Sequence, residues 1–89
     1  MRSSTTAKFR ALYQSAPKAI QDKAKAAYQL WSENPDHPSL RFKKVHSKLP
    51  IYSVRVDLDW RAVGVMEGDV VLWFWIGPHD EYEKLLRQF

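Results

Sequence analysis

Residues 70–76 constrain the fold of this chain more than any other segment, because they form an unbroken apolar run, Val-Val-Leu-Trp-Phe-Trp-Ile. The run is far too short to cross a bilayer. Read as a strand, it is apolar on both of its faces, and such a strand has to be covered on both sides. We therefore expect these residues to form a central strand of a sheet.

Two helices are expected before the sheet. Thr5 or Thr6 can cap a short helix that continues to about Ser15. Pro17 suits the first turn of a second helix, because its missing N–H has no helical partner there. The second helix has one apolar face with 3.6-residue spacing, which consists of Ile20, Ala24, Ala27, Tyr28 and Trp31. Residues 34–38, Asn-Pro-Asp-His-Pro, end this helix.

Three further strands and a last helix complete the pattern. Residues 40–45 and 60–66 are expected to be strands, and residues 52–58 alternate between apolar and polar side chains as a half-buried strand does. Glu67-Gly68-Asp69 is a hairpin signal that joins the third of these strands to the apolar run. Residues 79–88 have the spacing of a terminal helix.

The order of these elements predicts an α+β fold, with residues 1–89 as a single domain. Two N-terminal helices are expected to pack on a four-stranded antiparallel sheet, with a C-terminal helix. Residues 1–4 are expected to be a loose polar end. Helices on one face leave the other face of the sheet partly open, and that face can carry the function.

The charge balance indicates a partner with phosphate groups. Lys and Arg number 14 against 10 Asp and Glu, which gives a net charge of +4, and small basic domains attract polyanions. The alternative is a soluble protein that happens to be basic. Cysteine is absent, which excludes disulfides and thiolate ligands. His37 and His46 show no ligand spacing, so no metal site is expected, and residues 1–5 lack the apolar stretch of a signal peptide, so we expect a cytoplasmic protein.

Four segments, taken in order, carry a family resemblance. The first, in the two expected helices, is Phe9 with Pro17-x-x-Ile20-Gln21-x-x-Ala24 and Trp31-x-x-Asn34-Pro35. The second and third, in the expected strands, are Leu40-x-Phe42-Lys43-Lys44 and Tyr52-Ser53-Val54-Arg55-Val56-x-x-x-Trp60-Arg61-Ala62. The fourth, at the start of the last helix, is Trp75-Ile76-Gly77-Pro78-His79-x-x-Tyr82. The series resembles the RelE/ParE superfamily of bacterial toxins, which belong to type II toxin–antitoxin systems. The last segment is similar to the W-[IF]-G-T-H-x-x-Y ending of the HigB-like branch, with Pro78 where Thr is usual.

The resemblance implies a RelE-like fold and, for the RelE/HigB-like branch, an mRNA interferase. Such a toxin is a metal-independent, ribosome-dependent mRNA endonuclease that needs no cofactor. A ribose 2′-hydroxyl attacks the neighbouring phosphate, which requires a base, an acid for the leaving 5′-oxygen, and cations for the developing charge. The implied partners are a cognate antitoxin, mRNA and the ribosome, and no membrane. Two alternatives stay open: a ParE-like DNA gyrase inhibitor, and a non-catalytic member that binds only RNA or an antitoxin.

His79 is the first candidate for the acid–base group of such a reaction, because imidazole alone titrates near neutrality without perturbation. It opens the last helix, where the helix dipole opposes its protonated form and Asp80 supports that form. The alternative is a capping or solvent-facing histidine. Tyr82, three residues further on, is a second candidate, which would stack on a base or bond a phosphate. Its alternative is a place in the core.

Arg55 and Arg61 are candidates for binding the reacting phosphate, because each offers a planar fork of donors and the two should lie on neighbouring strands. The alternative is a cross-strand pair of either arginine with Asp57 or Asp59.

Basic residues of the first strand and the loop after it are candidates for RNA contacts. Lys43 and Lys44 point to opposite faces of one strand, and Lys43 is the better catalytic candidate because Lys44 shares a face with apolar residues. The candidates for RNA binding outside the catalytic centre are Arg41, Lys44, His46 and Lys48. The alternatives are edge-strand lysines that discourage aggregation and a solvated loop. Trp73 and Trp75 are expected to share a strand face, either as a stacking platform or in the core.

Overall fold

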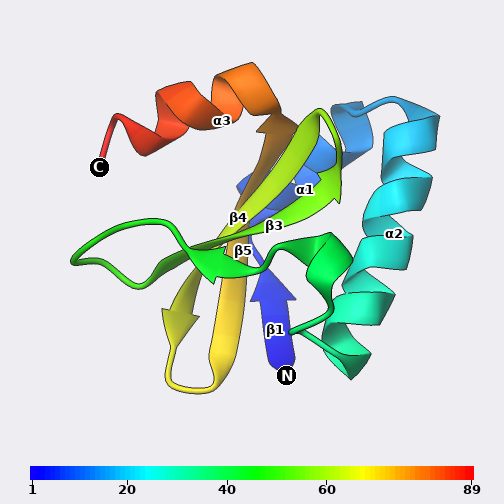
Figure 1. Ribbon diagram of the computed structural model, residues 1–89. Coiled ribbons are helices and arrows are strands. Elements are labelled where there is room, and N and C mark those ends of the chain that lie inside the picture. The colour runs from blue at the N-terminus through cyan, green and yellow to red at the C-terminus, as the bar shows by residue number, and fades with distance from the viewer.

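A computed structural model describes residues 1–89. Its elements run in the order β1 (Arg2–Thr5), α1 (Ala7–Ser15), α2 (Lys18–Glu33), the 3₁₀ turn η1 (Pro38–Leu40), β2 (Lys43–Lys44), β3 (Ile51–Asp57), β4 (Trp60–Glu67), β5 (Val70–Pro78) and α3 (His79–Leu86). Figure 1 shows α1 and α2 to one side of the sheet and α3 across its upper end. None of the three helices combines the length and the apolar character that a membrane span requires.

The sheet has five strands in the order β1-β5-β4-β3-β2. β1 runs parallel to β5, and all other neighbours are antiparallel. As the apolar run predicts, β5 lies inside the sheet, between β1 and β4. The expected α+β class and the three expected helices are confirmed, and the hairpin between β4 and β5 turns at Gly68, which has a φ of 62°.

The prediction of a loose N-terminus and a four-stranded antiparallel sheet is wrong by one strand. Residues Arg2–Thr5 form β1, in register with Val70–Trp73 of β5. The four side chains are polar and show no strand pattern, but the outer edge of β5 carries backbone groups that need partners, and β1 supplies them. The Ser3 hydroxyl also donates a hydrogen bond to the Tyr28 hydroxyl of α2, at 3.3 Å.

The strand expected over residues 40–45 is reduced to the two residues of β2. A 3₁₀ turn precedes it, and Arg41 has a left-handed φ of 47°. His37 caps the turn, because its Nδ1 accepts the Ser39 N–H at 3.2 Å. Pro38 and the left-handed residue interrupt any extended conformation before Phe42, so the paired strand is short.

A β-bulge between β4 and β5 overturns the expectation that Trp73 and Trp75 share a face. Val63 pairs with Trp75, but the next residue, Gly64, pairs with Trp73, so Phe74 is the extra residue. One extra residue reverses the alternation of side chains. Trp73 therefore packs in the core under α1 and α2, while Trp75 packs with residues of the opposite face.

The larger core lies between the sheet and the helices α1 and α2, and Trp31 is at its centre with 1% of its surface exposed. The Trp31 ring lies 5.3 Å from that of Trp73 and 5.6 Å from that of Phe42. Of the apolar face predicted for α2, Ile20 and Trp31 are buried. Tyr28 is 52% exposed, because it lies at the edge of this face, where its ring reaches Trp31 at 6.2 Å.

The start of each N-terminal helix follows from a single residue. Thr6 caps α1, since its hydroxyl accepts the Phe9 N–H at 3.1 Å. Of the two predicted cap candidates, Thr6 therefore has this role, and Thr5 ends β1. Pro17 directly precedes α2 as its N-cap residue, one position before the first turn in which it was expected.

Candidate functional site

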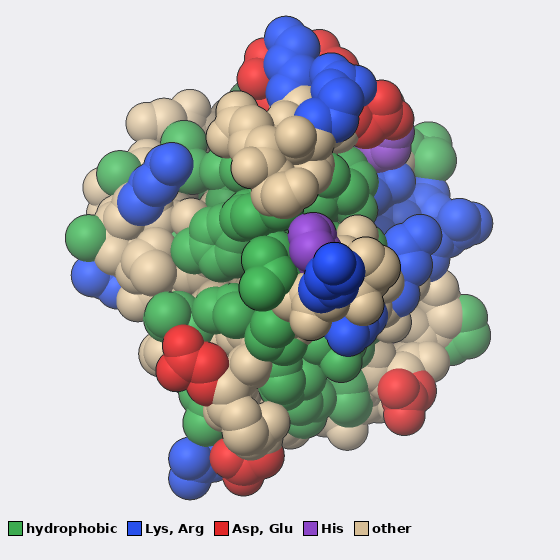
Figure 2. Space-filling view, turned by 90° about the vertical axis from the view of Figure 1, so that its left-hand side faces the viewer, with side chains coloured by type: hydrophobic (Ala, Val, Ile, Leu, Met, Phe, Trp, Pro, Cys, Tyr) green, Lys and Arg blue, Asp and Glu red, His purple; other side chains and the backbone are tan.

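The face of the sheet opposite α1 and α2 carries the predicted phosphate-binding residues. Val54 of β3 packs in the core under the helices, whereas Ile51 packs with Tyr82 of α3 on the opposite face. By alternation, Ser53 and Arg55 share the face of Ile51. We call the surface formed on this side by Arg41, Lys43, Arg55 and Arg61 the basic face. Figure 2 shows Lys and Arg side chains gathered along one flank of the molecule, with a His beside them.

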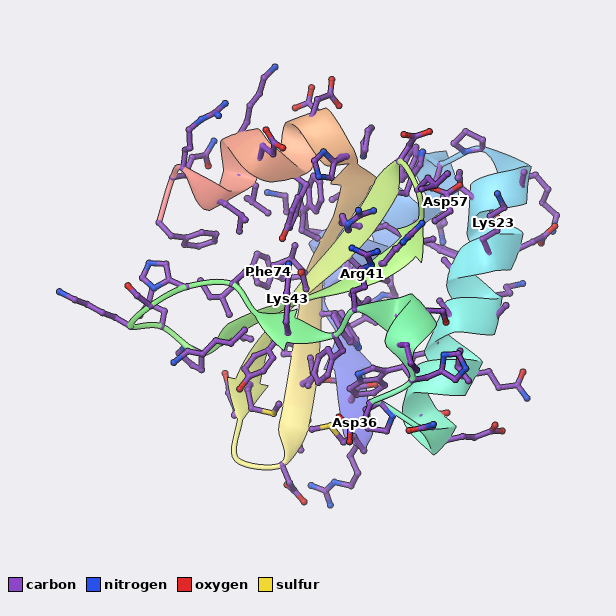
Figure 3. The ribbon with its side chains drawn as sticks, in the orientation of Figure 1. Lys23, Asp36, Arg41, Lys43, Asp57 and Phe74 are labelled. Carbon is purple, nitrogen blue, oxygen red and sulfur yellow. The ribbon has the colours of Figure 1, made fainter.

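Arg55 and Arg61 stand directly opposite each other on β3 and β4. Neither forms an ion pair with a carboxylate, so the predicted alternative of a cross-strand pair with Asp57 or Asp59 is not what the structure shows. Asp57 pairs instead with Lys23 of α2, at 3.2 Å, and Figure 3 shows the two side chains pointing toward each other. The opposition of Arg55 and Arg61 lowers the stability of the fold, because like charges directly opposite on neighbouring strands are destabilising.

Arg61 also holds the turn between β3 and β4. Its Nη1 donates hydrogen bonds to the carbonyl oxygens of Asp57, Trp60 and Leu58, at 2.7, 3.0 and 3.3 Å. Burial, followed by the nearby guanidinium of Arg55, lowers the pKa of Arg61 below its usual value. Nη2 and Nε are the remaining donors through which Arg61 can bind a phosphate.

Two further cations lie beside this pair. The charge of Arg41 contributes to the lowered pKa of Arg61, so Arg41 belongs to the same cluster. Lys43 pairs with Ser53, which places its side chain on the basic face, and Lys44 pairs with Tyr52 on the other face. Figure 3 shows Arg41 just before β2 and Lys43 on it. The same alternation in the sequence favours Lys43 over Lys44 as the candidate for this site.

His79 begins α3 next to the turn that Arg61 holds. Its N–H donates to the Asp59 carbonyl oxygen at 2.7 Å, and its side chain is 44% exposed. Its Nδ1 lies 3.4 Å from Glu83 Oε1. Asp80, which was expected to support the protonated form, instead accepts the Glu81 N–H at 3.0 Å. The reason is helical spacing, since residues i and i+4 lie on one face and residues i and i+1 do not.

Tyr82 joins α3 to the sheet. It is 8% exposed, and its hydroxyl donates a hydrogen bond to Ser53 Oγ at 3.1 Å. Its ring lies 5.7 Å from the His79 ring. Tyr82 belongs to the core cluster under α3, which is the alternative that the sequence left open for it. Sequence reasoning missed Ser53, which is 2% exposed. The feature of the sequence that could have identified Ser53 is its position two residues before Arg55, because alternation puts both side chains on one face of the strand.

His46 and Lys48 are not brought together with His79. His46 Nδ1 accepts the N–H groups of Lys48 and Leu49, at 3.0 and 2.9 Å, so its side chain braces the loop. The His46 ring packs edge-on against Phe89, at 6.3 Å. Phe89 lies beyond the C-terminal end of α3, whereas His79 begins that helix, and Figure 1 shows the loop on the C-terminal side.

Asp57, at the end of β3, makes the stability of the fold depend on pH. Burial of its carboxylate acts to raise its pKa, but the hydrogen bonds from the Asp59 N–H and Lys23 outweigh this effect, so the pKa lies below its usual value. A carboxyl group with a depressed folded pKa contributes stability above its unfolded pKa, about 3.9. That contribution is lost as the pH falls through the lower folded value.

We expect Asp57→Asn to lower the free energy of unfolding at pH 7 by about 1 kcal/mol. The variant should also lose less stability than the parent when the pH falls below about 4. Urea unfolding at several pH values measures both effects. The control is Asp69→Asn. The Asp69 carboxylate is 83% exposed and its ion pair with Arg2 is long, at 3.8 Å, so this pair should contribute little to stability. Parallel pH profiles for the Asp57 variant and the parent would contradict this account.

Together these residues place cations on the face of the sheet that α3 covers, with the imidazole of His79 at the start of that helix. The guanidinium groups can bind a phosphate, and the imidazole can transfer a proton. No group of three or more His, Asp or Glu side chains among residues 1–89 is placed to hold a metal ion.

Comparison with known proteins gives one family and several similar structures. Residues 18–84 match the family described as the ParE-like toxin domain. YafQ from Escherichia coli BL21(DE3) is 16% identical, with a TM-score of 0.73 over 92% of this chain and 98% of YafQ. A chain of the RelB-RelE antitoxin-toxin complex from Methanococcus jannaschii is 13% identical, with a TM-score of 0.73 over 91% of this chain and 95% of the other.

A third similar structure is the YoeB/ParE toxin from Agrobacterium tumefaciens. It is 14% identical, with a TM-score of 0.69 over 89% of this chain and 99% of that toxin. No curated protein matches the sequence significantly. The predicted RelE-like architecture is therefore confirmed at the level of the fold.

Proposed function

This chain belongs to the ParE-like toxin domain family, and from that premise we propose that it is the toxin of a type II toxin–antitoxin system. Its action in this proposal is cleavage of messenger RNA on the ribosome, in the cytoplasm, by protein side chains alone. The similar structures include toxins in complex with antitoxins, such as the E. coli DinJ-YafQ complex. We propose that a cognate antitoxin binds this chain as well, with a helical segment that covers the basic face and neutralises its charge.

The pairing of Arg55 with Arg61 carries the proposal. Two arginines at directly paired strand positions, with Arg41 nearby and no carboxylate bound to any of them, cost stability in the free protein. A phosphate bound between them would relieve that repulsion and accept hydrogen bonds from both. An RNA backbone supplies such a phosphate, and cations placed around it would stabilise the charge that develops on the phosphorane.

The proposed reaction forms a bond between a ribose 2′-oxygen and the adjacent phosphorus and breaks the bond from phosphorus to the 5′-oxygen. The 2′-hydroxyl loses a proton and the leaving oxygen gains one, so the products are a 2′,3′-cyclic phosphate and a 5′-hydroxyl. His79 is the proposed proton-transfer group, because Glu83 binds its Nδ1 and leaves Nε2 for RNA. Lys43 is the proposed further cation at this centre, and Tyr82 positions α3 on the sheet through its hydrogen bond to Ser53. Lys44, His46 and Lys48 are the residues proposed to contact RNA outside the centre.

Arg55→Ala should separate stability from function. Removal of one of two opposed charges is expected to raise the free energy of unfolding by about 0.2–1 kcal/mol at low salt. The same change should weaken RNA binding and reduce the slope of log K against log salt by about 0.7 for the lost phosphate contact. Urea unfolding and binding titrations with a short single-stranded RNA measure the two quantities.

The matched control for this prediction is Lys8→Ala. Lys8 is an exposed residue of α1, and its removal changes the net charge by the same amount. Its salt slope should stay that of the parent. Reduced stability of Arg55→Ala, together with unchanged RNA binding, would show that the arginine pair is structural.

A second candidate function is inhibition of DNA gyrase, which the ParE-like family match favours. Induced expression in bacteria distinguishes the candidates. Growth arrest with new cleavage ends in translated messages supports the nuclease. Growth arrest with intact messages and DNA damage supports gyrase inhibition, and no arrest supports a non-catalytic member that binds RNA or an antitoxin.

A further inference from the structure

The loop that joins β2 to β3, residues 46–50, is held in shape by one side-chain atom. The backbone N–H groups of Lys48 and Leu49 both donate hydrogen bonds to His46 Nδ1, at 3.0 and 2.9 Å. The loop connects two strands that contribute to the basic face. The two N–H groups in the interior of the loop therefore depend on a single imidazole nitrogen as their acceptor.

The same imidazole joins the loop to the C-terminal end of the chain. The His46 ring is half-buried and packs edge-on against Phe89, with the ring centroids 6.3 Å apart. The Phe89 ring packs edge-on against Phe74, at 6.2 Å, and Phe74 is the extra residue of the bulge in β5. A change in the charge of the His46 ring therefore acts directly on the contacts that hold the loop.

The hydrogen bonds of the loop require one protonation state of His46. An imidazole nitrogen accepts a hydrogen bond only when it carries no proton, so the ring must be neutral, with its proton on Nε2. In the imidazolium form both nitrogens are donors. A proton on Nδ1 would then face the N–H groups of Lys48 and Leu49, and a backbone N–H turns away only if the backbone itself moves. We propose that His46 is a pH-sensitive switch, which holds residues 46–50 closed when neutral and releases them when protonated.

His37 provides an internal comparison, because its Nδ1 caps a turn in a similar way. His37 Nδ1 accepts the Ser39 N–H at 3.2 Å and lies 2.8 Å from Ser39 Oγ. A hydroxyl can rotate and become an acceptor, so a protonated His37 keeps Ser39 Oγ as a partner. The loop of His46 offers no such hydroxyl to Nδ1, since both of its partners there are backbone N–H groups. Loss of order on protonation is therefore specific to residues 46–50.

Charges of both signs occur on the segments packed against His46. Lys48 lies in the same loop, and Lys44 ends β2 two residues before His46. The C-terminal carboxylate belongs to Phe89, with Arg87 two residues before it. None of these groups forms an ion pair with the imidazole. The cations favour the neutral ring and the carboxylate favours the protonated ring, so their effects on the switch oppose each other.

The test follows the order of the loop by ¹⁵N relaxation while the pH falls from about 7.5 to about 5, the range in which an unperturbed imidazole changes its charge. We expect the backbone order parameters of Lys48 and Leu49 to fall from about 0.85 to below about 0.6. The fall should follow the titration of the His46 ring protons. The order parameter of Ser39 should stay constant across the same range.

Two variants identify the ring as the cause. His46→Asn replaces Nδ1 by an amide oxygen that can accept the N–H two residues further on and does not titrate, so we expect Lys48 and Leu49 to be ordered at both ends of the pH range. His46→Ala removes the acceptor, so these two residues should be mobile already at about pH 7.5. The exposed position of the loop allows both variants to fold.

Three results would overturn the proposal. They are constant order of Lys48 and Leu49 in the parent while the His46 ring titrates, the same loss of order in His46→Asn, and an equal loss at Ser39. No RNA is present in the measurement, so the switch can fail without affecting the proposed nuclease function, and the reverse also holds.

Discussion

Replacement of His79 by alanine is expected to slow RNA cleavage by about 10²–10⁴-fold, the usual contribution of a positioned acid or base. The effect should appear in the rate of the chemical step and not in RNA binding, because the proposal assigns phosphate binding to the arginines of β3 and β4. The fold should be unaffected, since the His79 side chain is 44% exposed and pairs only with Glu83. Single-turnover cleavage of ribosome-bound message measures the rate, and circular dichroism checks the fold.

Glu83→Gln tests how His79 works. Loss of the carboxylate should leave cleavage measurable and reduce it less than His79→Ala does, because the imidazole stays but loses the group that orients it. The neighbouring variant Asp80→Asn is the matched control, because Asp80 bonds a backbone N–H and not the imidazole. If His79→Ala cleaves RNA at the parental rate, the imidazole is not the proton-transfer group.

Trp31→Ala is expected to lower the free energy of unfolding by about 3–5 kcal/mol. Trp31 is the most enclosed aromatic side chain of the core and packs against both Trp73 and Phe42. A domain of this size is stable by only about 5–15 kcal/mol, so the variant should be close to unfolding at 37 °C. Urea unfolding measures the change as a lower midpoint at a constant slope.

Tyr28→Ala is the matched control, because Tyr28 is also an aromatic residue of α2 but is 52% exposed. It should cost about 1 kcal/mol or less. Equal losses in the two variants would contradict the placement of the core between the sheet and the helices.

The elements that the sequence predicted well are those with a strong local signal. The run 70–76 is apolar on both faces, and it forms an interior strand. The spacing of Ile20 and Trp31 identifies the buried side of α2, and Gly68 marks the hairpin turn. In each case the residues that fix the local structure are the same residues that the core or the turn requires.

The elements that sequence reasoning missed depend on contacts between distant segments. Residues Arg2–Thr5 become β1 only because β5 offers a free edge, and their own side chains carry no strand pattern. The bulge at Phe74 separates Trp73 from Trp75, and no alternation rule reveals it.

The candidate site shows the same division. Alternation along β3 and β2 placed Arg55 and Lys43 on one face, as the register has them. It did not show that Arg55 stands directly opposite Arg61, since that depends on the length of the turn. The hydrogen bond from Tyr82 to Ser53 joins residues from different elements, and only the packing of α3 reveals it.

The most direct test of the proposed nuclease site is to map messenger-RNA 5′ ends in bacteria during induced expression, with growth followed in the same cultures. The parent is compared with the double variant His79→Ala/Arg55→Ala and with the charge control Lys8→Ala. We predict growth arrest and new 5′ ends within translated regions for the parent and for Lys8→Ala, and neither effect for the double variant. New 5′ ends that persist in the double variant, or arrest of the parent with intact messages, would contradict the assignment of this face as the site of RNA cleavage.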